Sequence, residues 1–310
     1  MTALGVCTSF HVNAVAAAED QAVQPFLGRW DVTLQTPGRA WSSWLDIEQI
    51  DGELKVQMVG RWGHARWLPH AEIIGGRIRF VSPKAEEAFE NGDMVFEGAR
   101  DGDALVGDTH GPDGTRWTWR AERVPALARA GMPRWGKPIA LFDGRDLAGW
   151  HLAAPAKATW SVADRMLIST GGGADLRTEA TFGDFKLHVE FNVARGANSG
   201  VYLRGRYEVQ IEDDAVPEEP TMRTGGVYGW LAPNPPAQRT PGVWQSYDLT
   251  LVGRRVSVVL NGRTVIDDAE VPGITGGALD SNEGAPGPIV LQGSETGRVE
   301  FRNIVLTPVR

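Results

Sequence analysis

Short segments in which apolar and polar residues alternate run through most of the sequence. Between Pro25 and Pro125, dipeptides such as Asp51-Gly52 and Gly75-Gly76 separate these segments. A period of two is typical of strands, and such dipeptides favour tight hairpins because Gly and Asp tolerate positive φ. The pattern predicts an antiparallel sheet that curls toward a barrel. The expected strands are 29–35, 41–49, 53–60, 65–69, 72–74, 77–81, 93–100, 104–110 and 116–123.

From Pro138 onward the alternating segments are longer, and none shows the period of an amphipathic helix. Val252-Gly253 and Asn261-Gly262 supply the turns between neighbouring segments. This part of the sequence predicts a two-sheet sandwich or jelly roll. The expected strands are 186–193, 200–204, 206–212, 244–252, 254–260, 263–267, 288–292 and 298–307.

The fold class is therefore all-β, with a jelly-roll sandwich preceded by a smaller, barrel-like antiparallel β domain. Gly28-Arg29-Trp30 resembles the G-x-W start of lipocalin-like barrels. We expect four parts: a leader or disordered tail at 1–23, the lipocalin-like domain at 24–126, a linker at 127–137 and the jelly roll at 138–310.

Composition narrows the class of protein. The 310 residues are 42% hydrophobic and 23% charged, which is typical of a soluble globular protein. The net charge is −8 without a Lys/Arg block, so we expect no nucleic-acid partner. No apolar run approaches the roughly 20 residues of a membrane span. The single cysteine, Cys7, excludes an internal disulfide.

The first 20 residues hold a short apolar stretch and an A-x-A-like end before Glu19. This is typical of an export signal, here without a basic start, and it favours a periplasmic or extracellular location. The alternative is a disordered tail.

Alternation also predicts a polar sheet face. In 186–193, Leu187, Val189 and Phe191 point toward the core, so the residues between them point away. If the neighbouring strands share one sheet, that face is rich in groups that bind hydroxyl-rich ligands. A solvated face is the alternative. The face would carry His188, Glu190, Asn192, Tyr202, Arg204, Glu208, Gln210, Glu212 and Gln292.

The strand Glu208-Val209-Gln210-Ile211-Glu212 resembles the E-x-D-x-E strand of laminarinase-type retaining glycosidases. Such enzymes need carboxyl groups about 5–5.5 Å apart. Residues four apart on a strand are separated by about 13 Å at Cα. Gln210 also replaces the central Asp, so the ordinary glycosidase mechanism is the weaker hypothesis.

A second resemblance covers about 139–308. The segments 141–150 (LFDGRDLAGW), 187–191 (LHVEF) and 198–211 (NSGVYLRGRYEVQI) resemble, in order, motifs of the 3-keto-disaccharide hydrolase domain family. The segments 226–229, 241–248 and 301–304 continue the likeness. The resemblance implies a concanavalin-like jelly roll that acts on 3-keto-glycosides.

The implied chemistry starts at the ketone on C3, which acidifies the proton on C2. A base removes this proton and the group on C1 is eliminated. Glu190 or Glu208 is the expected base, Arg204 and Gln210 are expected near the ketone oxygen, and His188 is the candidate acid. Other expected substrate contacts are Asn198, Tyr202, Glu212, Tyr228, Trp230 and Gln292.

This chain departs from the family pattern at residues 291–295. It reads Leu-Gln-Gly-Ser-Glu where the family often has Leu-Gln-Asp-His-Gly. The loss of the Asp-His pair favours a non-catalytic carbohydrate-binding protein as the alternative function. No cofactor is certain. A calcium or mixed metal site is a further hypothesis, with an ordinary solvated turn as its alternative. Its candidate ligands are His188, Glu208, Glu212, Asp213 and Asp214.

Overall fold

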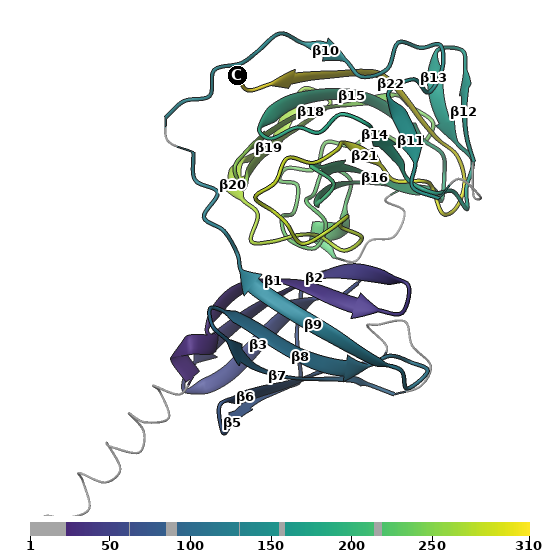
Figure 1. The fold of residues 1–310 in the computed structure, drawn as a ribbon. Helices are drawn as coiled ribbons and strands as arrows, with labels where there is room; N and C mark the ends of the chain where they lie inside the picture. The colour runs from purple at the N-terminus through teal and green to yellow at the C-terminus, as the bar shows by residue number, and fades with distance from the viewer. Residues whose placement is uncertain (1–22, 62, 85–91, 130, 155–158, 214–218) are drawn as a thin grey trace, which may run out of the picture. The chain divides into compact units, whose positions relative to one another are not determined.

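The computed structural model describes residues 23–310 apart from 62, 85–91, 130, 155–158 and 214–218. The described residues form two compact units (Figure 1). The N-terminal unit comprises 23–61 and 66–124, and the C-terminal unit comprises 63–65 and 125–310. The expected leader at 1–23 lies outside the described residues except for its last position. No helix in the described part of the chain is long and apolar enough to cross a membrane.

The N-terminal unit is a single antiparallel sheet of nine strands. A short 3-10 helix, η1 (Gln24–Phe26), precedes it. Its strands are β1 (Gly28–Thr36), β2 (Arg39–Ile50), β3 (Glu53–Val59), β4 (Arg66–Trp67), β5 (His70–Ile74), β6 (Arg77–Ser82), β7 (Met94–Asp101), β8 (Ala104–His110) and β9 (Arg116–Arg123). They are ordered β4-β3-β2-β1-β9-β8-β7-β6-β5. The predicted barrel-like antiparallel domain is confirmed.

Turn residues and small residues under an aromatic ring explain two features of this sheet. Asp51 and Gly52 have φ of 53° and 81°, the left-handed pair that a tight hairpin requires. Gly98 and Gly107 lie beneath the ring of Trp119, and a Cβ at either position would lie within 2.6 Å of that ring. Two glycines in neighbouring strands thus allow a large aromatic core residue to pack flat against the sheet.

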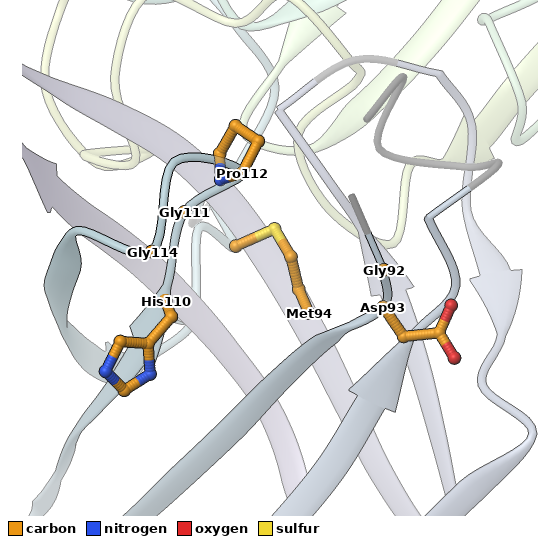
Figure 2. A pocket seen from close by; sticks show the side chains of 7 residues that line it. All are labelled: Gly92, Asp93, Met94, His110, Gly111, Pro112 and Gly114. Carbon is orange, nitrogen blue, oxygen red and sulfur yellow. The ribbon is translucent and has the colours of Figure 1, made fainter. Parts of the chain in front are cut away.

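A pocket of about 340 Å³ opens in the N-terminal unit, at the start of β7 and the turn between β8 and β9 (Figure 2). In Figure 2 the imidazole of His110 and the carboxylate of Asp93 lie on opposite sides of Met94. The rest of the lining is Gly92, Gly111, Pro112 and Gly114. This lining does not bring catalytic groups together.

The C-terminal unit contains two sheets. The large sheet has eight strands: β10 (Ile139–Ala140), β12 (Trp160–Ala163), β13 (Met166–Ser169), β15 (Phe185–Val193), β18 (Gln245–Val252), β19 (Arg255–Leu260), β20 (Arg263–Glu270) and β22 (Val299–Pro308). The small sheet has five: β11 (Trp150–Leu152), β14 (Leu176–Thr178), β16 (Asn198–Leu203), β17 (Tyr207–Glu212) and β21 (Val290–Leu291). A 3-10 helix, η3 (Pro220–Met222), follows β17.

The two sheets enclose one apolar core. Phe191 and Tyr247 from the large sheet pack in the same cluster as Val201 and Val209 from the small sheet. Figure 1 shows β15, β18 and β19 in one layer and β14, β21 and β16 in the other. The predicted jelly-roll sandwich is therefore confirmed.

The prediction of one shared polar face is wrong. β15 belongs to the large sheet, whereas β16, β17 and β21 belong to the small sheet. Each sheet turns its apolar side to the common core, so its polar side faces outward, away from the other sheet. His188, Glu190 and Asn192 consequently lie on the outer face of the large sheet, and Tyr202, Glu208, Gln210 and Glu212 lie on that of the small sheet.

Candidate functional site

The outer face of the small sheet carries a row of cross-strand neighbours. His151 pairs with Arg177, and Arg177 pairs with Val290. Val290 also pairs with Tyr202, and Tyr202 pairs with Glu208. Because directly paired residues point to the same side of a sheet, these five side chains share one face. The register therefore places Glu208, Tyr202 and Arg177 in one line across four strands.

A second row lies beside the first. Gly200 pairs with Gln210, and the backbone amide of Gln292 donates to the carbonyl of Gly200 over 2.9 Å. The backbone amide of Gly293 donates to Oδ1 of Asp175 over 3.2 Å. Asp175, directly before β14, and Gln292, directly after β21, therefore lie beside the strands that carry the row of Glu208.

Glu208 and Tyr202 form a buried pair at the centre of this face. They are only 3% and 4% exposed, and the Tyr202 hydroxyl lies 2.9 Å from Oε2 of Glu208 and 3.0 Å from the carbonyl oxygen of Gly276. A hydroxyl has one proton and cannot donate to both oxygens. The Tyr202 hydroxyl therefore has two acceptors within reach, the Glu208 carboxylate and the Gly276 carbonyl, and its contact with Oε2 orients the Glu208 carboxyl.

Gly200 makes room for this carboxyl. A Cβ at Gly200 would lie 2.2 Å from Oε1 of Glu208 and 2.8 Å from its Cγ. The backbone amide of Glu208 donates to Oγ1 of Thr275 over 3.0 Å. Gly200 beneath the side chain and the Thr275 hydroxyl, which accepts from the backbone amide, together hold Glu208 in one position.

Burial, together with the negative charges of Asp175, Glu212 and Glu295, raises the pKa of Glu208 to about 8, against the lowering effect of the Tyr202 hydrogen bond. Burial also raises the pKa of Asp175. Raised carboxyl pKa values in one place are typical of acid–base sites.

Half-buried residues surround the pair. The amide of Tyr228 donates to the carbonyl of Glu208 over 3.0 Å, and burial raises the pKa of Tyr228 to about 12. Asn198 and Glu212 pair across β16 and β17 at the far end of the same face. Trp230 packs against the core, and its Nε1 donates to the carbonyl of Ile274 over 3.2 Å.

Arg204 lies elsewhere, contrary to the prediction. β16 ends at Leu203, and Arg204 takes a left-handed φ of 53°, which breaks the alternation that would have placed it beside Tyr202. Its Nη2 lies 2.5 Å from the carbonyl of Gly253 and 3.4 Å from the hydroxyl of the core residue Tyr207. Arg204 therefore stabilises the core side of the turn and cannot assist Glu208.

Glu190 and His188 form a separate cluster on the large sheet. Oε2 of Glu190 accepts from Arg302 over 2.6 Å and Oε1 accepts from Asn303 over 3.1 Å. Nδ1 of His188 lies 2.7 Å from Oδ1 of Asp248. The prediction that these residues and Glu208 form one site is wrong because they lie on opposite outer faces of the sandwich.

The proposed metal ligands are not assembled either. His188 is on the other sheet, Oδ2 of Asp213 accepts from the amide of Gly196 over 2.7 Å, and Asp214 lies outside the described residues. Among the described residues, no group of three or more His, Cys, Asp or Glu side chains is placed to hold a metal ion.

Sequence reasoning missed Asp175 and Arg177. They flank Leu176 at the start of β14, a strand of three residues. Three residues show too little alternation to predict a strand, although the order Asp-Leu-Arg-Thr agrees with one buried residue between two polar ones.

Comparison with known proteins identifies the region that carries this face. The model of the 3-keto-α-glucoside-1,2-lyase-like domain family matches residues 137–307, more than half of the chain. The N-terminal unit and the pocket in Figure 2 lie outside the match. A comparison with curated proteins finds no match.

Solved structures are similar to about half of this chain. Two proteins of Parabacteroides distasonis, which carry the provisional name of glycosyl hydrolase, are 28% and 20% identical. They cover 55% and 56% of this chain and 82% and 94% of their own, each with a TM-score of 0.47. A carbohydrate-binding module of Bacillus subtilis is 15% identical, covers 53% of this chain and 97% of its own, and has a TM-score of 0.36.

Proposed function

The chain belongs to the 3-keto-α-glucoside-1,2-lyase-like domain family, and from this premise we propose that its C-terminal unit cleaves the glycosidic bond of 3-keto-glycosides. The site is the outer face of the small sheet around Glu208. The observation that carries the proposal is the buried Glu208 carboxyl, whose pKa is raised to about 8 and which is held by Tyr202 in a family-matched domain.

The reaction is an elimination across C1 and C2. Ionised Glu208 takes the proton from C2, the electron pair of that bond forms C2=C3, and the C3 carbonyl becomes an enolate. The carbonyl then reforms, C1=C2 is created and the bond from C1 to the leaving oxygen breaks. The leaving oxygen takes up a proton, so the net change moves one proton from C2 to the aglycone.

A raised pKa suits Glu208 to this role. A carboxylate is normally too weak a base for a carbon acid, and desolvation strengthens it. After the first step Glu208 holds the proton that the leaving oxygen needs, so one carboxyl serves as base and then as acid. Glu208 therefore takes the role of acid that the sequence assigned to His188, which lies on the other sheet. Tyr202 keeps the carboxyl oriented. Gln292, whose Oε1 has no hydrogen-bond partner among the described residues, is our candidate for binding a sugar hydroxyl.

The test compares two carboxyls of the same domain. With p-nitrophenyl 3-keto-α-glucoside as probe, we expect the wild type to release p-nitrophenol, and Glu208→Gln to lose at least about 100-fold in kcat. Glu190→Gln, on the outer face of the large sheet, is the matched control and should retain activity. Turnover that survives Glu208→Gln but not Glu190→Gln would overturn the assignment.

A non-catalytic carbohydrate-binding protein is the second candidate function, because residues 291–295 lack the Asp-His pair of the family pattern. A carbohydrate-binding protein would bind the keto-glucoside or a glucoside, measured by calorimetry, and release no aglycone. Binding that is weakened equally by Glu208→Gln and Gln292→Ala, without turnover, would favour this second function.

A further inference from the structure

Elimination needs a positive charge near the oxygen on C3, where negative charge develops. Arg204 was predicted for this role, but it contacts Gly253 and Tyr207 on the core side of its turn. Within the five strands of the small sheet, all of them described, Arg177 is the only Lys or Arg. The row that contains Glu208 therefore carries one permanent cation.

The guanidinium group of Arg177 has a hydrogen-bond donor that no described protein group accepts from. Its Nη2 lies 4.0 Å from Oδ2 of Asp175, the outer limit of an ion pair. Its Nε is buried and has no hydrogen-bond partner among the described residues, and the same holds for Oε1 of Gln292 on the adjacent row. A buried polar atom without a protein partner calls for an explanation, and a bound ligand that donates to Gln292 and accepts from Arg177 would satisfy both atoms.

Arg177 and Glu208 lie at opposite ends of one row of cross-strand neighbours. Arg177, Val290, Tyr202 and Glu208 follow one another across β14, β21, β16 and β17. Three strand spacings separate the backbones of Arg177 and Glu208 by about 14 Å. Val290 and Tyr202 lie between them on the same face, so Arg177 and Glu208 flank this stretch of the sheet from opposite ends. The C3 oxygen and the C2 proton of a 3-keto-glycoside are neighbours on the sugar ring, and a ring bound over this stretch would turn one toward Arg177 and the other toward Glu208.

We propose that Arg177 is a catalytic residue that binds the C3 oxygen of a 3-keto-glycoside and stabilises the enolate. The inference rests on the proposed function and adds a residue that the sequence did not indicate. As Glu208 takes the C2 proton, the electron pair of the C2–H bond forms C2=C3 and the carbonyl pair moves onto oxygen. The guanidinium donates to that oxygen and balances its charge, while Asp175 limits how the guanidinium turns.

The experiment measures kcat and KM of Arg177→Lys and Arg177→Ala with p-nitrophenyl 3-keto-α-glucoside. We expect kcat of Arg177→Ala to fall about 100- to 1,000-fold with a smaller change in KM, because the charge on oxygen exists only in the transition state. Arg177→Lys should be intermediate. Added guanidinium ion should restore part of the activity of Arg177→Ala and none of that of Glu208→Gln. The matched control is Arg263→Gln, an exposed arginine of the large sheet, which should behave as wild type.

Exchange of the C2 proton with solvent in D2O distinguishes stabilisation of the enolate by Arg177 from an action of Arg177 on the leaving group. If Arg177 stabilises the enolate, exchange and elimination slow together in Arg177→Ala. If exchange continues at the wild-type rate while only elimination slows, Arg177 acts on the leaving group and the proposal is overturned.

These experiments distinguish failure of the role of Arg177 from failure of the proposed function. Wild-type turnover with an unimpaired Arg177→Ala overturns the role of Arg177 alone. Folded wild-type protein that neither exchanges C2 nor releases aglycone overturns the proposed function and this inference with it. Should Arg177→Ala not fold, as judged by circular dichroism, Arg177→Lys with the exchange readout decides the question.

Discussion

The two outer faces of the C-terminal sandwich carry glutamates with opposite chemistry. Glu190, on β15, has a side chain that is 26% exposed and bonds to Arg302 and Asn303. Burial raises its pKa, but the hydrogen bonds from Arg302 and Asn303 outweigh this effect and the pKa is lowered overall. Glu208, on β17, is buried beside a phenol and other carboxyls, and its pKa is raised to about 8.

Residue type and strand position therefore do not decide the reactivity of these two glutamates. Both glutamates alternate with core residues on long strands and both point away from the core. One face offers a guanidinium that stabilises the charged form. On the other face, burial and negative neighbours favour the protonated form and outweigh the hydrogen bond from the Tyr202 hydroxyl. The second environment suits proton transfer and the first suits an ion pair.

The largest expected effect concerns stability against pH. The folded pKa of Glu208 is raised from 4.5 to about 8. The folded state therefore holds a proton that the unfolded state has lost between these values, and stability falls as pH rises through this window, by at most about 5 kcal/mol. Urea unfolding from pH 4.5 to 8 should show this slope in the wild type and a much shallower one in Glu208→Gln. Glu190→Gln should keep the slope. Equal slopes in the wild type and Glu208→Gln would contradict the raised pKa.

The next effect concerns the space under Glu208. Gly200→Ala places a Cβ 2.2 Å from Oε1 of Glu208. Overpacking of this kind costs about 1–3 kcal/mol and displaces the carboxyl. We expect a lower midpoint of urea unfolding and a lower kcat. The control is Gly183→Ala, where an added Cβ meets no atom within 4 Å. Full activity in Gly200→Ala would show that Glu208 has no fixed position.

A smaller effect is expected from Tyr202→Phe, which removes the hydroxyl that lies 2.9 Å from Glu208. Loss of this bond costs about 1–3 kcal/mol and raises the pKa of Glu208 further. In the wild type kcat/KM should rise with pH toward a plateau above about 8, because Glu208 must be ionised to act as base. The midpoint of that curve should move to higher pH in Tyr202→Phe. A midpoint that stays in place would argue that Tyr202 does not orient the base.

The smallest effect is expected on the other face. Arg302→Gln breaks the 2.6 Å ion pair with Glu190, in which the arginine side chain is 44% exposed. Exposed pairs contribute less than about 1 kcal/mol, so the unfolding midpoint should change little. Turnover should equal that of the wild type. A large loss of activity would place the reaction on the large sheet and reverse the comparison.

Long strands and their turns were predictable. The alternation of Leu187, Val189 and Phe191 correctly indicates which side of β15 meets the core. The pair Asp51-Gly52 correctly indicates a hairpin. The strands β11 to β14 were not predicted, because each has only three or four residues, too few to show an alternation. The pairing of β11 with β14 also joins residues that are distant in the sequence.

The two β-rich parts, the all-β class and, apart from Arg204, the polar residues that face away from the core follow from local periodicity and turn chemistry, so they could be predicted from the sequence. The sheet that each strand joins depends on long-range pairing and became known only from the folded structure. Strand pairing joins residues distant in sequence, such as Arg177 and Val290, and one sheet or two give the same alternation. That choice separated Glu190 from Glu208, turned Arg204 toward the core, and brought Arg177 onto the row of Glu208.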